Sequence, residues 1–311
     1  MRIHLDTDLG SNVDDAVALA LLLGAAEVEL TGITTCIDPG GRRAACVDEL
    51  LGLAGRGEVE VVAGAEVSLT TGRTPGPPPR GGGRGGQGLV RPPDQAGAAL
   101  RLLAGSVAAG ATVLAIGPCT NLALLAVDRP GVLAGTHVVL MGGWFDLPAD
   151  GLPESGPARD WNLQCDPVAA EVLLRHAGRL TMVPLPLTFR AHLVERHLER
   201  MARAGPLGRL LAAQARAQAG ERSMAALARE HPALPPDLLA FLHDPLAGAV
   251  ALGWPLVTIE ERTVVPVLEG DVLRVSEDPK GRAVGVAVDL DAEALEQGWL
   301  AAVEAAGPRP R

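Results

Sequence analysis

Short apolar runs alternate along this chain with longer segments of helical pattern, and this alternation restricts the possible folds more than any other feature. The runs that we expect to form buried strands are residues 3–5, 28–35, 61–63, 113–116, 137–141 and 180–183. Helical segments lie between them, at residues 16–23, 44–54, 96–109 and 167–176. Such alternation predicts an α/β fold with a mostly parallel open sheet flanked by helices. Ligands of such sheets bind beyond the carboxyl ends of the strands, so polar residues directly after a strand are candidate site residues.

The last third of the chain has a different pattern. Residues 189–252 are mostly helical in pattern, with a break at residues 231–236. Small edge strands are expected after them, at residues 257–267, 272–275 and 283–288, before a terminal helix at residues 292–306. No internal repeat and no linker of distinct composition divides the sequence. We therefore expect a single Rossmann-like domain over residues 1–311.

Residues 73–93, RTPGPPPRGGGRGGQGLVRPP, contain too few apolar side chains to bury a core. Their composition predicts a flexible Gly/Pro/Arg surface loop. A mobile lid over a binding site is the functional alternative. Four arginines without interleaved aromatic residues are weak evidence for RNA binding.

Charge and cysteine usage restrict the partners and the compartment. The formal net charge is −10, and an acidic chain does not attract phosphate backbones over its whole surface. We therefore expect a small neutral substrate or a cation, and no nucleic acid. No apolar run reaches the roughly 18 residues of a transmembrane helix. The four cysteines include no CxxC spacing, and no signal-peptide pattern is visible, which favours free thiols in a cytoplasmic protein without membrane contact.

The densest chemical signal is the sequence DTDLGSNVDDA, between a predicted strand and a predicted helix. It carries four carboxylates and one amide, on Asp6, Asp8, Asn12, Asp14 and Asp15. Like charges this close raise one another's pKa values unless a positive charge lies among them. A bound divalent cation meets this need, and carboxylate oxygens suit Ca²⁺ or Mg²⁺ better than zinc. Helix capping is an alternative explanation of Asp14 and Asp15, but it leaves Asp6 and Asp8 unexplained.

Two further motifs are ambiguous when taken alone. His243-Asp244-Pro245 begins a predicted helix, where a structural histidine and a capping aspartate are the simpler explanation. Asp160 and Asn162 stand two residues apart. In an extended segment both side chains would point the same way, which suits hydrogen bonding to sugar hydroxyls. Asp166, which precedes a proline, is expected to act only as a helix cap.

Seven segments resemble the inosine–uridine-preferring nucleoside hydrolases. DTDLGSNVDDAVAL is similar to the family signature usually written DxDPGxDDAxAL, and DWNLQCDPVAA resembles a ribose-binding segment that usually begins EFN. The other similar segments, in the same order along the chain, are ITTC, IGPCTNLA, VVLMGG, TMVPLPLT and HDP. They are spread from Asp6 to Pro245, over most of the length of the chain. The resemblance implies an enzyme that hydrolyses the N-glycosidic bond of a ribonucleoside to ribose and free base, as a homodimer or homotetramer.

The resemblance also implies a calcium site. Asp8, Asp15 and Asp244 would ligate Ca²⁺ together with the carbonyl oxygen of Ile116. Asp8 would in addition take the proton from a calcium-bound water. A cation lowers the pKa of its water, so hydroxide becomes available near neutral pH.

Four residues would contact the substrate in the same scheme. Asp14 would hold the ribose 2′-hydroxyl, and Asn162 and Asp160 would hold ribose hydroxyls, chiefly towards the 5′ side. His243 would face the leaving base as a candidate acid. Carboxylates beside the ribose would stabilise the oxocarbenium character of the transition state.

Several positions depart from the family pattern. Two extra residues separate Gly10 from the Asp14-Asp15 pair, and Pro39, beside Asp38, stands where an asparagine usually touches the sugar. Asp160 replaces a glutamate, Pro186 replaces a common aspartate, and the usual histidine-bearing loop is replaced by the Gly/Pro/Arg segment. We therefore expect altered substrate contacts and an unusual nucleoside or related N-riboside. The sequence does not name the base.

Two other functions are compatible with the sequence. A calcium-dependent riboside-binding protein of the same fold would keep the metal and lose turnover. A haloacid-dehalogenase-like phosphatase would use the Asp6-x-Asp8 pair, but such enzymes need a lysine near the phosphate, and Lys280 is the single lysine of the chain.

Overall fold

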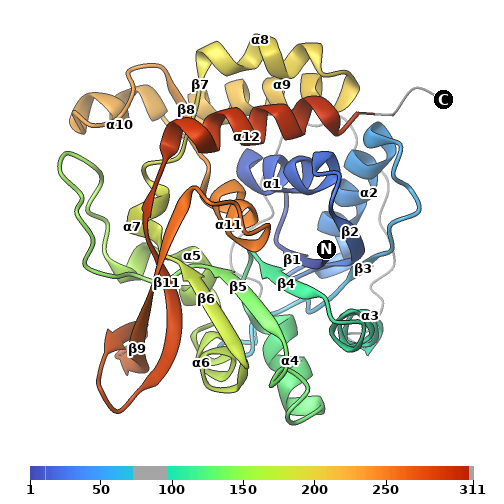
Figure 1. The fold of residues 1–311 in the computed structure, drawn as a ribbon, viewed down its shortest axis with the longest axis vertical. Coiled ribbons are helices and arrows are strands. Elements are labelled where there is room, and N and C mark those ends of the chain that lie inside the picture. Colours follow the sequence, from blue (N-terminus) through green and yellow to red (C-terminus); the bar gives the residue numbers. More distant parts are fainter. Residues whose placement is uncertain (11, 73–96, 308–311) are drawn as a thin grey trace.

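The computed structural model describes residues 1–10, 12–72 and 97–307 (Figure 1). Its described part contains a nine-stranded sheet in the order β10-β9-β11-β6-β5-β4-β1-β2-β3. The six strands of the N-terminal two thirds are β1 Arg2–Thr7, β2 Glu29–Thr35, β3 Val61–Ala63, β4 Thr112–Ala115, β5 His137–Met141 and β6 Arg179–Val183. Each pairs in parallel with its neighbours, which confirms the predicted parallel sheet.

The C-terminal strands extend one edge of this sheet. They are β9 Val257–Glu269, β10 Val272–Glu277 and β11 Arg282–Leu290. The strand β11 pairs in parallel with β6, and β9 and β10 follow it as antiparallel strands. The predicted edge strands are therefore present, and the sheet as a whole is mixed.

Helices cover both faces of the sheet (Figure 1). On one face lie α1 Val13–Gly24, α2 Arg42–Ala54, α11 His243–Ala251 and α12 Ala292–Ala305, with α8 Glu195–Arg203 and α9 Pro206–Glu221 outside them. On the other face lie α3 Gly97–Ala108, α4 Thr120–Asp128 and α6 Pro167–His176. Buried side chains form one apolar cluster on each side, because strands covered on both faces must be apolar on both.

The segment expected to be helical also contains strands. Besides α10 Met224–Glu230, it includes β7 His192–Val194 and β8 Leu238–Phe241, which pair with each other as a separate antiparallel sheet. A short apolar run such as LLAF has no periodicity that separates a strand from a buried helical turn. The finding matters for function because β8 leads directly into α11, which begins at His243.

The predicted loop at residues 73–93 lies outside the described residues. Within the described ranges, no helix is long and apolar enough to cross a membrane. The four cysteines are free thiols, as expected.

Candidate active site at the carboxyl ends of the central strands

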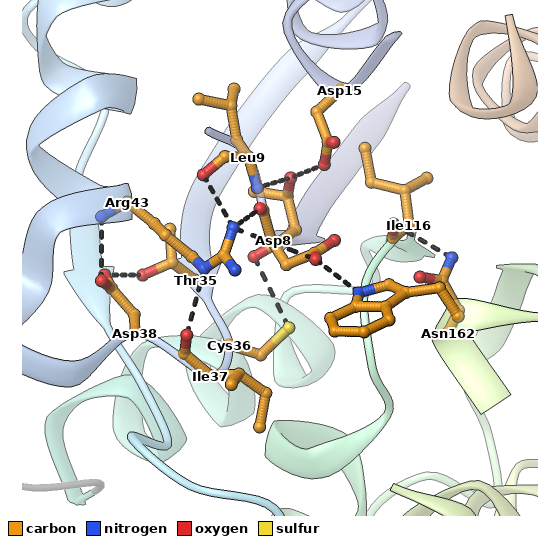
Figure 2. Close-up of polar contacts among 12 residues, drawn as sticks. Asp8, Leu9, Asp15, Thr35, Cys36, Ile37, Asp38, Arg43, Ile116 and Asn162 are labelled. Atoms are coloured by element: carbon orange, nitrogen blue, oxygen red, sulfur yellow. Dashed lines mark hydrogen bonds and ion pairs between the residues drawn. The ribbon is translucent and has the colours of Figure 1, made fainter. Parts of the chain in front are cut away.

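Polar residues gather where three neighbouring strands of the sheet end. Asp8 follows β1, Ile116 follows β4, and Met141 is the last residue of β5. Gly117 permits the close approach of two of these ends, because a Cβ atom there would lie 2.7 Å from the backbone nitrogen of Asp8. Figure 2 shows Asp8, Ile116 and the neighbouring polar residues in this region. The position agrees with the rule that ligands bind at this edge of a parallel sheet.

Three buried carboxylates form the centre of the site. Asp14 and Asp15 lie in the first turn of α1, and Asp244 lies in the first turn of α11. One oxygen from each lies within 4.8 Å of the others. All three residues are at most 4 % exposed. The two helices therefore begin beside each other and bring together acids that are more than 200 positions apart in the sequence.

These carboxylates lack enough positive charge around them in the described structure. Burial raises the pKa of Asp14 to about 7. Burial and the neighbouring carboxylates raise the pKa values of Asp15 and Asp244 well above the usual range. Asp14 Oδ1 is buried without a hydrogen-bond partner among the described residues. An orphaned oxygen within an all-oxygen donor set fits a hard divalent cation.

Asp8 lies beside this group rather than within it. Its charge contributes to the raised pKa values of Asp14, Asp15 and Asp244, but its oxygens lie outside the 4.8 Å cluster. Asp8 Oδ2 accepts a hydrogen bond of 2.9 Å from Trp161 Nε1 and lies 3.9 Å from Arg43 Nη1. Burial raises the pKa of Asp8, and these two partners oppose that rise. In the described structure Asp14, rather than Asp8, thus completes the group of carboxylates that lie within 4.8 Å of one another.

Arg43 is a site residue that the sequence did not reveal. Its side chain is buried and donates to the backbone carbonyls of Asp8, Leu9 and Ile37 (Figure 2). It therefore fixes the turn after β1 and places a positive charge beside the acids. An arginine in the first turn of a helix after a Gly-Gly turn is normally expected at the surface, so the sequence does not predict that Arg43 is buried.

Asp38 has a structural task. Its carboxylate accepts hydrogen bonds from the backbone nitrogens of Arg43 and Ala44, at 2.8 and 3.0 Å, and from Thr35 Oγ1 at 2.7 Å. Both carboxylate oxygens of Asp38, which is only 1 % exposed, therefore already have hydrogen-bond partners, two of them at the start of α2. Asp38 therefore does not take the place of the asparagine that usually touches the sugar in this family.

The segment that carries Asp160 and Asn162 is not extended, so the expected common direction of these side chains is wrong. Asp160 caps the short helix α5 Trp161–Gln164, and its carboxylate accepts from the backbone nitrogens of Leu163 and Gly143. Asn162 Nδ2 instead donates to the carbonyls of Ile116 and Met141, at 3.1 and 3.0 Å. At an N-cap the backbone passes from extended to helical, so side chains two positions apart no longer point the same way, and the sequence pattern of a cap resembles that of a polar loop. Asp166 caps α6, as predicted, but it is not only a cap, because its carboxylate also accepts hydrogen bonds from Leu69, Thr70 and Thr120.

His243 precedes Asp244 in the first turn of α11, and its ring lies 5.5 Å from that of Phe241 and 5.8 Å from that of Phe189. Its Nδ1 lies 2.6 Å from Thr188 Oγ1, in the short helix α7 Leu185–Thr188. Because Thr188 donates its own proton to the carbonyl of Leu185, the neutral imidazole carries its proton on Nδ1. Burial, and then the charge of Arg222, lower the pKa of His243 to about 3. The imidazole is therefore neutral at neutral pH.

The end of α9 also reaches the site. Gln218 Oε1 accepts a hydrogen bond of 2.7 Å from the backbone nitrogen of Val13, at the start of α1. Arg222 follows α9, and its charge lowers the pKa values of both Asp14 and His243. Neither residue was expected, since polar side chains are common on the outer face of a surface helix.

Asp6 belongs to the framework beneath the site. Its Oδ1 accepts from Thr34 Oγ1 and from Asn121 Nδ2, at 2.5 and 2.7 Å, which connects β1 with β2 and α4. Lys280 lies in the turn between β10 and β11, where its backbone nitrogen donates to Asp278. These positions give no support to the phosphatase alternative, which needs Asp6 and a lysine at one phosphate.

Comparison with known proteins agrees with this site. Residues 3–297 match the family model described as inosine-uridine preferring nucleoside hydrolase. The pyrimidine-specific ribonucleoside hydrolase RihA of Salmonella agona (strain SL483) is 30% identical over 222 residues, covering 68% of this chain and 69% of RihA.

Solved structures give the same result. The purine-preferring ribonucleoside hydrolase from Gardnerella vaginalis is 25% identical, with a TM-score of 0.78 over 98% of this chain and 99% of that one. A plant nucleoside hydrolase shares the fold, with a TM-score of 0.78, 23% identity and coverage of 97% and 98% of the two chains. The chain therefore belongs to the inosine–uridine-preferring nucleoside hydrolase family, and it is a hydrolase that acts on N-glycosyl bonds.

Proposed function

We propose that this protein is a calcium-dependent nucleoside hydrolase that releases ribose and free base from a ribonucleoside or a related N-riboside. The observation that carries the metal dependence is the buried cluster of Asp14, Asp15 and Asp244, in which burial and the neighbouring carboxylates raise the pKa values of the proposed ligands Asp15 and Asp244 well above the usual range. The residues that would hold Ca²⁺ are Asp8, Asp15, Asp244 and the carbonyl oxygen of Ile116. The Ile116 carbonyl already accepts from Asn162, but a carbonyl oxygen has a second lone pair for a metal.

Bound Ca²⁺ would lower the pKa of the attacking water and hold ribose hydroxyls. Asp8 would accept the proton of that water, because it is the buried carboxylate directly beside the cluster. Its role as general base requires the ionised form, and the charge of Arg43 favours that form. Asp8 would then carry the proton while the bond to the base breaks.

Three residues would orient the ribose. Asp14 would accept from the 2′-hydroxyl through its free Oδ1. Asn162 uses its nitrogen for backbone carbonyls, so its oxygen would accept from a ribose hydroxyl. Asp160 would contribute as an acceptor towards the 5′ side, in addition to its capping bonds. The carboxylates would also stabilise the positive charge that develops on the ring.

His243 would contact the leaving base. With a pKa of about 3, the imidazole can deliver a proton at neutral pH only if the bound substrate raises that pKa. One relative is named pyrimidine-specific and another purine-preferring, so both classes of base are candidate leaving groups. We further infer one domain, a homodimer or homotetramer, and a cytoplasmic location, which the free thiols support.

Calorimetric titration with CaCl₂ tests the metal assignment. Wild type should bind one equivalent of Ca²⁺ per chain, and Asp244→Asn should bind at least about 10-fold more weakly, since the ligand loses its charge. Asp271→Asn, an exposed acid in the turn between β9 and β10, is the matched control and should bind as wild type does. Equal affinity of all three proteins would contradict the site. Riboside binding with calcium but without ribose release would instead indicate a binding protein.

A further inference from the structure

Trp161 combines an exposed ring with a buried polar contact. Its side chain is 47% exposed, which is unusual for a residue of this size. Its Nε1 nevertheless donates to Asp8 Oδ2 over 2.9 Å, and Asp8 is only 4% exposed. Burial of the ring therefore does not explain its position, whereas the hydrogen bond to the carboxylate does.

The backbone that carries this indole is held firmly. Asp160, on one side, accepts from the backbone nitrogens of Gly143 and Leu163. Asn162, on the other side, donates to two backbone carbonyls at the ends of β4 and β5. The indole nitrogen is thus presented to Asp8 from a segment fixed on both sides.

The same oxygen of Asp8 also faces a cation. Arg43 Nη1 lies 3.9 Å from Asp8 Oδ2, and Arg43 in turn is anchored on the carbonyls of Leu9 and Ile37 (Figure 2). A carboxylate held at one oxygen cannot turn freely about its Cβ–Cγ bond, so its other oxygen keeps a fixed direction. Hydrogen bonds to charged groups are strong enough to impose such an orientation.

We propose that Trp161 is a positioning residue for Asp8: its indole N–H holds Oδ2, so that Oδ1 stays directed at the attacking water. This inference rests on the proposed role of Asp8 as general base. Phenylalanine, which stands here in the usual EFN pattern, has no donor. The hydrogen bond from Trp161 to Asp8, called the clamp below, is therefore a property of this chain's own tryptophan.

Trp161→Phe tests the proposal, because it removes the donor and keeps the ring. The variant should fold, since the side chain is half exposed. Loss of one hydrogen bond to a charged group should lower kcat about 10-fold or more and leave KM nearly unchanged. Trp254→Phe is the matched control. Trp254 packs against Gly298 of α12, far along the chain from the clamp. This substitution should change neither kcat nor KM.

A spectroscopic measurement tests the contact without turnover. The chain has four tryptophans, and the indole ¹H–¹⁵N signal absent from Trp161→Phe identifies Trp161. In Asp8→Asn this signal should shift more than the other three, because its acceptor has lost its charge.

The outcomes separate the two proposals. Three results would overturn the positioning role and leave the hydrolase function standing. They are a wild-type kcat in Trp161→Phe, a rise in KM alone in that variant, and an indole signal of Trp161 that does not shift in Asp8→Asn. Ribose release absent from wild type as well would refute the function, and the positioning role with it.

Discussion

Asp14→Asn should stabilise the metal-free protein at neutral pH although it removes a site residue. Burial raises the pKa of Asp14 from 3.8 to about 7, so the folded state binds a proton more tightly than the unfolded state does. Stability therefore falls as pH rises from about 4 to about 7, and the full penalty persists above that window. Three pH units at about 1.36 kcal/mol each give an upper limit of about 4 kcal/mol.

The gain in unfolding free energy should be smaller than this limit, because the repulsion is shared with Asp15 and Asp244, whose pKa values the charge of Asp14 raises. We expect about 1–2 kcal/mol, which corresponds to roughly 1.5 °C in Tm per kcal/mol for 311 residues. Thermal unfolding in EGTA at pH 5 and pH 8 measures it, with the exposed Asp271→Asn as control. The variant should exceed wild type at pH 8 and differ less at pH 5. A variant that is less stable at pH 8 would refute the argument and show that the Asp14 carboxylate is already well paired.

Two further substitutions test other parts of the site. Arg43→Met removes a buried cation and its bonds to the carbonyls of Leu9 and Ile37, and should cost about 3 kcal/mol of unfolding free energy together with most of kcat. Urea unfolding and initial rates measure both, and unchanged values would show that Arg43 is dispensable. His243→Ala should slow inosine at least about 10-fold more than p-nitrophenyl riboside, whose leaving group needs no proton; equal slowing of both substrates would exclude proton delivery by His243.

The sequence predicted well those features that depend on periodicity and on single strand ends. The apolar runs that form β1, β4 and β5 are buried on both faces, and such runs are visible without a structure. Acids directly after the first strand had to lie at the ligand-binding edge of the sheet. The start of α11 at His243 followed from the Asp-Pro pair.

The features that escaped prediction depend on contacts between distant segments. Arg43 is recognisable as a site residue only once α2 is packed beside the turn after β1. Trp161 reaches Asp8 across 153 positions, and no local pattern encodes such a contact. The direction of Asp160 and the pairing of β7 with β8 were decided by capping and by tertiary pairing, which override short-range patterns.

Ribose release from a panel of purine and pyrimidine ribonucleosides, with calcium and again with EGTA, tests the central claim most directly. The panel should be run on wild type and on Asp8→Asn, with the exposed Asp271→Asn as control. We predict calcium-dependent release by wild type and by the control, and a loss of at least about 1,000-fold in Asp8→Asn, since both base and ligand charge are removed. Release that persists in EGTA, or in Asp8→Asn at the wild-type rate, would contradict the account.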